Sequence, residues 1–96
     1  MLTGKQKRYL RDLASREKAL FQVGKDGLSE NFFLTMRNAL MARELVKISV
    51  LKTCPLELNE IKIEVAANTG SEIVQTIGRN IVFYKQSREK KIVLSK

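Results

Sequence analysis

Residues 19–30 have the sequence ALFQVGKDGLSE, in which an apolar run, a glycine loop and a helix start follow one another directly. The run ALFQV ends at Gly24 and is typical of a buried strand. Ser29 is a good N-cap, and the apolar stripe after it predicts a helix over about residues 30–42. The stretch therefore predicts a strand joined to a helix by the tight loop of residues 24–27.

The preceding and following segments predict a second helix and a second strand. Thr3 as N-cap, with Gln6 three residues later as its capping-box partner, predicts a basic amphipathic helix over about residues 4–16. The alternating, β-branched run over residues 45–51 predicts a strand.

Residues 55–69 carry mixed signals. Pro55 is typical of the first position of a helix, and Gly70 is typical of the residue that ends one. The run 61–65, however, alternates as a strand does. Periodicity alone therefore leaves helix and strand open for this segment.

Two strand-like runs close the pattern, residues 72–77 and 81–85, separated by a basic turn at residues 78–80 that is typical of a hairpin. A basic tail over about 86–96 follows, in which residues 92–94 could add a short strand. Crossovers through helices require parallel pairing, and the hairpin requires antiparallel pairing. We therefore expect one α/β domain of the α+β-sandwich type, with the order α-β-α-β-α-β-β and a four-stranded mixed sheet packed against helices.

The net charge of +8 lies entirely at the two ends of the chain. Residues 1–18 carry a net charge of +4, residues 85–96 carry another +4, and residues 19–84 hold seven basic and seven acidic side chains. Such a balance attracts polyanions, nucleic acid first and an acidic membrane surface second. The alternative is that the excess charge only maintains solubility.

The inventory of reactive side chains argues against catalysis. The chain has no histidine, and its one cysteine, Cys54, has no partner for nucleophilic chemistry and is expected to be a small buried apolar residue. No phosphate-binding loop of the GxxxxGK[ST] type and no GxGxxG fingerprint is present. We expect a monomeric, cytoplasmic protein that is not an enzyme, holds no cofactor or metal and has no signal peptide or membrane span.

The loop formed by Gly24, Lys25, Asp26 and Gly27 is the first candidate binding element. The first turn of a helix has free N–H groups and a partial positive charge, and Lys25 adds a mobile, exposed cation, so the loop could clamp a sugar–phosphate backbone as the GXXG loop of KH modules does. The alternative is an ordinary strand-to-helix turn, and Asp26 counts slightly against a phosphate site.

The second candidate element is the hairpin, where Arg79 is expected at an exposed tip, followed by Asn80 and Lys85. Phe83 is expected in the core, whereas Tyr84 could be core or a stacking surface for bases. The third element is the set of basic residues near the chain ends: Lys5, Lys7, Arg8, Arg11, Arg88, Lys90 and Lys91.

Four segments resemble the CRM domain family, named for chloroplast RNA splicing and ribosome maturation. Residues 23–30 (VGKDGLSE) are similar to the family's GxxGL-T/S-E segment, and residues 44–48 (ELVKI) to its ELIKVK strand. Residues 69–85 contain TG, E, VQ, IGR and YK in the family's order, and residues 5–14 (KQKRYLRDLA) match its first helix. The resemblance spans about residues 3–93. Two departures are Thr-Cys-Pro at 53–55, where the family has a more polar connection, and Phe83 in place of leucine.

The resemblance is greatest to the bacterial single-domain, YhbY-type members. It implies a fold similar to the C-terminal domain of translation initiation factor three, a KH-like GxxG loop and a helix over residues 55–69. It also implies binding to ribosomal RNA in precursors of the large subunit, to assist ribosome assembly. A role in intron splicing, as in plant relatives, and a protein–protein adaptor on the ribosome remain the alternatives.

Overall fold

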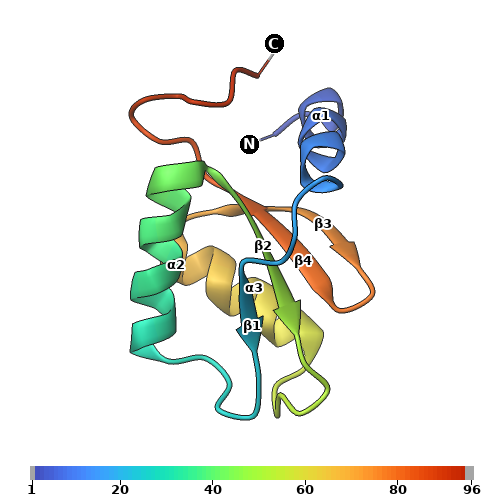
Figure 1. The fold of residues 1–96 in the computed structure, drawn as a ribbon, viewed down its shortest axis with the longest axis vertical. Helices are drawn as coiled ribbons and strands as arrows, with labels where there is room; N and C mark the ends of the chain where they lie inside the picture. The colour runs from blue at the N-terminus through green and yellow to red at the C-terminus, as the bar shows by residue number, and fades with distance from the viewer. Residues whose placement is uncertain (1, 95–96) are drawn as a thin grey trace.

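The structure is a computed structural model that describes residues 2–94, and its helices and strands follow the expected order (Figure 1). The elements are α1 (Gly4–Ala14), β1 (Phe21–Val23), α2 (Glu30–Arg43), β2 (Leu45–Val50), α3 (Leu58–Thr69), β3 (Glu72–Ile77) and β4 (Asn80–Tyr84). The prediction of a mixed four-stranded sheet packed against helices is confirmed. None of the helices within residues 2–94 has the length and apolar character that crossing a membrane requires.

The strands lie in the order β1-β2-β4-β3. β1 pairs with β2 in parallel, and β4 pairs with β2 and β3 in antiparallel fashion. β2 and β3 therefore run in the same direction but do not pair, so the expectation that each crossover through a helix joins paired parallel strands was wrong for the crossover through α3. The tight hairpin folds β4 back into the space between them, where Ile81 and Phe83 bury their side chains.

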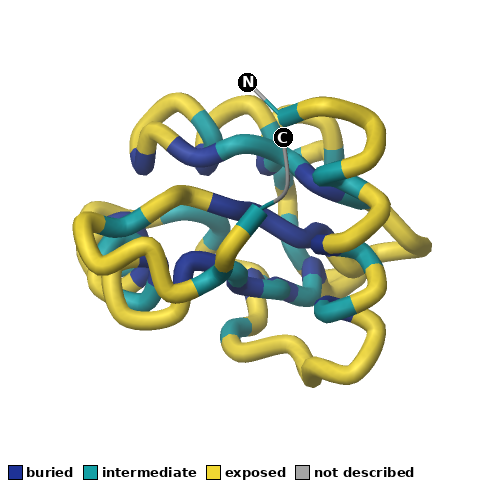
Figure 2. The backbone as a smooth tube through the Cα atoms, turned by 90° about the horizontal axis from the view of Figure 1, so that it is seen from above, coloured by how far each residue is buried: buried dark blue, intermediate teal, exposed yellow. Residues whose placement is uncertain are grey.

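One face of the sheet is covered by α2 and α3. β2 alternates strictly between half-buried and buried positions, and its buried residues Val46, Ile48 and Val50 belong to this layer. Figure 2 shows that the outer loops of the backbone are largely exposed, with buried segments between them. Together with the helices they form the larger core cluster: Val23, Phe33, Met36, Leu40, Val46, Ile48, Val50, Ile61, Val65, Ile81 and Phe83. Cys54 is half-buried and packs against the same cluster.

The opposite face of the sheet is covered in part by α1 and by the C-terminal tail. Its buried cluster is Leu10, Ala14, Val74, Val82 and Tyr84, with Leu2, Leu13, Leu45, Ile92 and Leu94 packed around it. Tyr84 is 4% exposed, so it belongs to the core and is not a stacking surface. The capping box of α1 is confirmed, because Gln6 donates its N–H to the Thr3 hydroxyl at 3.1 Å and its side chain accepts from Thr3 at 2.9 Å.

Several element ends differ from the predictions. α1 ends at Ala14, two residues early, and β1 contains only residues 21–23. α3 is a helix, but it begins at Leu58 with Glu57 as N-cap, so the assignment of Pro55 to its first position was wrong: residues 51–57 form an irregular connection first. Gly70 ends α3 in the left-handed conformation, as predicted.

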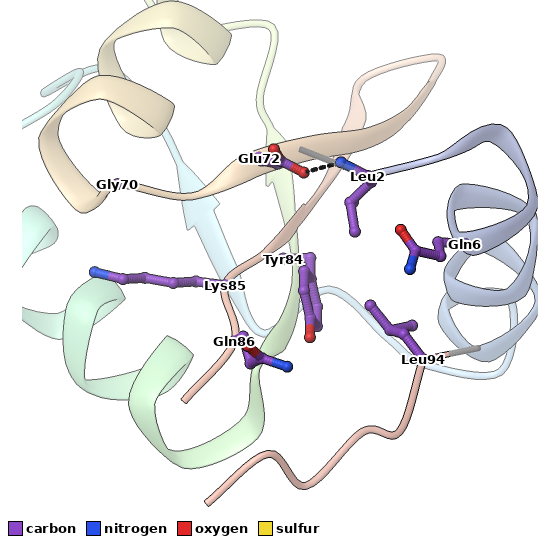
Figure 3. A pocket seen from close by; sticks show the side chains of 8 residues that line it. All are labelled: Leu2, Gln6, Gly70, Glu72, Tyr84, Lys85, Gln86 and Leu94. Carbon is purple, nitrogen blue, oxygen red and sulfur yellow. Dashed lines mark hydrogen bonds between the residues drawn. The ribbon is translucent and has the colours of Figure 1, made fainter. Parts of the chain in front are cut away.

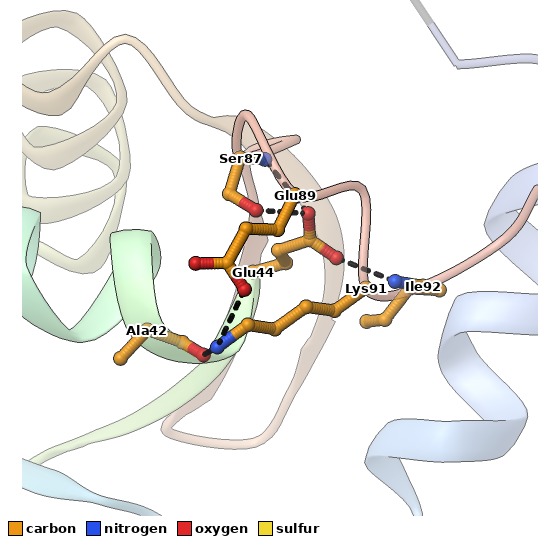
Figure 4. Close-up of polar contacts among 6 residues, drawn as sticks. All are labelled: Ala42, Glu44, Ser87, Glu89, Lys91 and Ile92. Carbon is orange, nitrogen blue, oxygen red and sulfur yellow. Dashed lines mark hydrogen bonds and ion pairs between the residues drawn. The ribbon is translucent and has the colours of Figure 1, made fainter.

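The predicted strand at residues 92–94 was wrong, because the tail crosses the molecule as irregular chain held by a buried carboxylate (Figure 4). Glu44 is 0% exposed and ends α2 at φ 68°. It accepts hydrogen bonds from the Ser87 N–H and hydroxyl, both at 2.7 Å, and from the Ile92 N–H at 2.6 Å. Beside it, the Lys91 ammonium donates to the Ala42 carbonyl at 2.7 Å. Residues 95–96 of the expected tail lie outside the described residues.

The environment of Glu44 favours its ionised form. Burial by itself raises the pKa of this carboxyl, but hydrogen bonds from the Ser87 hydroxyl and from the main-chain N–H groups of Ser87, Ile92 and Lys91 outweigh it. The pKa therefore lies below the ordinary value of 4.5. An ionised Glu44 fastens the tail across the end of the sheet.

Candidate nucleic-acid interface

Three connections meet at one end of the sheet, called the loop end here. The register aligns Val23 with Val50, and it aligns Asn80 with both Ser49 and Ile77. The GKDG loop of residues 24–27, the 51–57 connection and the hairpin turn at residues 78–79 therefore lie next to one another (Figure 1).

The GKDG loop is a tight turn closed by a hydrogen bond of 3.0 Å from the Gly27 N–H to the Gly24 carbonyl. Lys25 is exposed, as predicted, and so is Asp26. Gly27 has φ +64°, and a Cβ on Gly24 would lie 3.4 Å from Leu51 Cδ1. The turn therefore favours glycine at position 27, whereas Gly24 lies at an ordinary contact distance from the 51–57 connection, and Lys25 between them is exposed.

The helix start behind this loop is already partly satisfied. The Ser29 hydroxyl accepts the Phe32 N–H at 3.0 Å, which confirms the predicted N-cap. Glu30 places a carboxylate in the first turn, where it interacts favourably with the helix dipole. Together with Asp26, Glu30 reduces the attraction that this helix end exerts on a phosphate.

Arg79 is exposed, as expected, yet its guanidinium also joins the hairpin to the end of β2. Its Nε donates to the Val50 carbonyl at 2.7 Å, and Nη2 donates to the Leu51 carbonyl at 3.1 Å. These bonds hold the planar group beside the 51–57 connection, where Lys52 is exposed. The sequence analysis missed Lys52, although its place directly after a strand parallel to β1 is a usable signal, since the carboxyl ends of parallel strands meet at one edge.

Lys85 lies at the other end of β4. Its side chain extends toward Gly70 at the end of α3 (Figure 3). Its ammonium donates to the Thr69 carbonyl at 2.9 Å and thereby satisfies the last turn of α3. It borders a cavity of about 400 Å³ that Tyr84 and Leu94 also line. The Leu2 N–H donates to Glu72 at 3.0 Å beside this cavity. This corner of the molecule therefore fixes residues near both chain ends, Leu2 through this hydrogen bond and Leu94 through packing.

The fold brings the two basic ends of the chain to the same side of the sheet, because Ile92 and Leu94 pack in the cluster that contains Leu10. On α1, Lys5 and Arg8 are exposed, and Lys7 and Arg11 are half-buried. On the tail, Arg88 and Lys90 are exposed, and Arg88 lies beside Met41 near the end of α2.

The basic residues therefore form two zones. The 14 residues of α2 separate the GKDG loop from the tail by about 20 Å, at about 1.5 Å per residue. Lys25, Lys52 and Arg79 belong to the loop end, and the basic residues of the tail lie far from it. An anionic partner that contacts both zones must be larger than a single nucleotide.

Known proteins of similar sequence identify the family of this chain. The model of the CRS1 / YhbY (CRM) domain matches residues 2–85. The Bacillus subtilis (strain 168) protein named "Probable RNA-binding protein YqeI" is 47% identical over 91 residues, which cover 95% of each chain. A Haemophilus influenzae protein named "RNA-binding protein" is 37% identical over 97 residues, covering 97% of this chain and 94% of the relative.

Among solved structures, that of SAV1595 from Staphylococcus aureus is 45% identical in sequence and superimposes with a TM-score of 0.82, covering 99% of this chain and 100% of the other. The relatives are named for RNA binding and not for an enzymatic activity. The predicted resemblance is thus confirmed: the chain belongs to the CRS1 / YhbY (CRM) domain family.

Proposed function

We propose that the protein binds RNA, that this RNA is ribosomal RNA in precursors of the large ribosomal subunit, and that it acts there as a monomer in the cytoplasm. The observation that carries the proposal is the exposed turn with Lys25, which stands at the start of α2 beside Lys52 and Arg79. The names of the relatives support RNA as the partner. The family resemblance supports the ribosomal assignment.

The charges favour contact with the RNA backbone at this end of the sheet. Lys25, Lys52 and Arg79 can each meet a phosphate, while Asp26 and Glu30 limit the net attraction of the loop end. Much of the excess charge lies on α1 and the tail, so full use of it requires a folded RNA that extends over both zones. A structured ribosomal RNA satisfies this requirement.

The phosphate clamp is tested by comparing Lys25→Glu with Lys62→Glu. Both variants reverse one charge, but Lys62 lies within α3, outside the three connections that make up the loop end. We expect Lys25→Glu to weaken RNA binding at least about tenfold more than Lys62→Glu, a difference of about 1.4 kcal/mol. Thermal melting should place the stability of Lys25→Glu within about 0.5 kcal/mol of the parent, as for most surface changes. Equal losses of affinity would mean that the GKDG loop is only a turn.

The identity of the RNA is tested separately, by crosslinking bound RNA in cells and sequencing it. Enrichment of large-subunit ribosomal RNA, with cofractionation of the protein with large-subunit precursors on sucrose gradients, is the expected result. Enrichment of intron-containing transcripts would favour the splicing role instead. A protein that fractionates with ribosomes but does not bind isolated RNA would favour the adaptor role.

A further inference from the structure

The face of the sheet beneath α1 is covered over only part of its length. Leu10 and Ala14 pack over Val82 and Tyr84, and toward the loop end the same face opens into a groove of about 480 Å³. Arg8, Arg11 and Asp12 line the groove from α1, and its floor contains three residues of β3 and β4: Gln75, Ile77 and Asn80. Ile77 is 61% exposed, although it lies within a strand.

A β-bulge in β3 turns the side chains of Gln75 and Ile77 toward the groove. The register of β3 against β4 shifts between Ile73, which pairs with Phe83, and Gln75, which pairs with Val82. Ile73 packs against the core beneath α2 and α3, whereas Val82 lies on the α1 side. Without the extra residue, the alternation of the strand would turn Gln75 and Ile77 toward that core. The bulge instead places a side-chain amide and an apolar side chain on the open face.

The charges around the groove suit an anionic strand. Arg8 and Arg11 stand on one wall with Asp12, and Lys47 lies beside them with its ammonium donating to the Glu17 carbonyl at 2.9 Å. At the other edge Asn80 directly follows Arg79. The positive groups therefore outnumber the carboxylates along this side of the groove.

The groove borders the loop end, because its residue Asn80 directly follows the hairpin turn at residues 78–79. The Arg79 guanidinium contacts the carbonyls of Val50 and Leu51, and the Leu51 side chain packs against Gly24. An RNA strand whose backbone lies on the GKDG loop can thus pass the hairpin turn and enter the groove.

We propose that this groove takes an unpaired nucleotide of the bound RNA and gives the protein its base preference. Arg8 and Arg11 contact the phosphate, the base packs on Ile77, and the amides of Gln75 and Asn80 bond its edge. Side-chain amides both donate and accept, which lets them distinguish base edges, and sequence-specific recognition of RNA uses unpaired bases. The volume lies within the range of about 300–1,000 Å³ of small-molecule sites. The inference rests on the proposed function, because it assigns selectivity to an RNA-binding protein.

The test uses four RNA hairpins that share one stem and differ only in a loop of A, C, G or U. The full chain is titrated with each at one salt concentration. We expect the affinities to differ by about fivefold or more between the best and the poorest loop, as amide contacts to a base edge allow. The double variant Gln75→Ala with Asn80→Ala is expected to bind all four hairpins with the affinity that the parent shows for its poorest loop.

The matched control is Asn59→Ala with Gln86→Ala, two exposed polar side chains outside the groove, and it should discriminate as the parent does. If the parent binds RNA without preference, or if the double variant keeps the preference, the groove is not a base-reading site, although the RNA-binding proposal stands. If the parent binds none of the hairpins, both proposals fail. If melting shows the double variant to be unfolded at the assay temperature, Gln75→Ala alone carries the test.

Discussion

Replacing Glu44 by glutamine should loosen the C-terminal tail and lower the stability of the whole protein. One carboxylate oxygen accepts two hydrogen bonds from Ser87, and the other accepts the Ile92 N–H. An amide has only one oxygen. If that oxygen keeps the two bonds to Ser87, the NH₂ group must face the N–H of Ile92, so one bond is lost and two buried donors oppose each other.

The magnitude follows from these contacts. A hydrogen bond to a charged group contributes about 1.5–3 kcal/mol, and a buried donor without a partner costs about 1–3 kcal/mol. We expect Glu44→Gln to lower the free energy of unfolding by about 3 kcal/mol, out of the about 5–15 kcal/mol typical of a domain. Release of the tail limits the loss, because water then solvates the freed groups.

Thermal melting and amide hydrogen exchange measure the two parts of this effect. For a chain of 96 residues the melting temperature should fall by about 12–24 °C, and the amides of Ser87 and Ile92 should exchange faster than in the parent. Glu17→Gln, which changes an exposed carboxylate, is the matched control and should melt with the parent. A Glu44→Gln protein that melts within about 2 °C of the parent, with both amides still protected, would refute the reasoning.

Four further predictions concern electrostatics and burial. RNA affinity should fall by about 10³–10⁵ between roughly 50 and 200 mM salt if ~6–10 phosphates are contacted, and a flat response in a salt titration would contradict a backbone mechanism. Tyr84→Phe should raise the melting temperature by about 4–8 °C and leave RNA binding unchanged, because its buried hydroxyl has no hydrogen-bond partner within residues 2–94. Because the pKa of Glu44 is lowered, the stability that this carboxylate contributes is present above pH 4.5 and lost as the pH falls through its folded-state pKa. In acid, the melting temperature of the parent should therefore fall more steeply with decreasing pH than that of Glu44→Gln. Burial, with the charges of Glu44 and Glu72, raises the pKa of Tyr84 above its ordinary 10.0, so stability should also decline in alkali above that value, except in Tyr84→Phe.

Local signals in the sequence were sufficient for most elements of the fold. The capping box of Thr3 and Gln6, the N-cap Ser29 and the left-handed Gly70 each act within one turn of chain, so they could be identified without knowledge of the tertiary structure. The same holds for the exposure of Lys25, because a turn between two glycines at a strand–helix junction lies on the surface.

Features that depend on distant partners could not be predicted in this way. The position of β4 between β2 and β3 is decided by pairing across residues far apart in sequence, and no local pattern encodes it. The ammonium of Lys85 and the guanidinium of Arg79 bind main-chain carbonyls at sequence separations of 16 and 29 residues. Glu44 appeared only as the first letter of a strand motif, and its burial is explained by Ser87 and Ile92, more than 40 residues further along the chain.

The central place of β4 has a consequence for folding during synthesis. β4 comprises residues 80–84, so among the strands within residues 2–94 it is the last to leave the ribosome, yet β2 and β3 are joined to each other only through it. Until it emerges, the nascent chain has no continuous sheet on which α1 can close, and the inner edge of β2 remains unpaired. Long-range pairing of this kind slows folding and leaves strand edges open to other chains. The core can therefore be completed only after residue 84 has been translated, and chains truncated before residue 80 are expected to aggregate instead of folding.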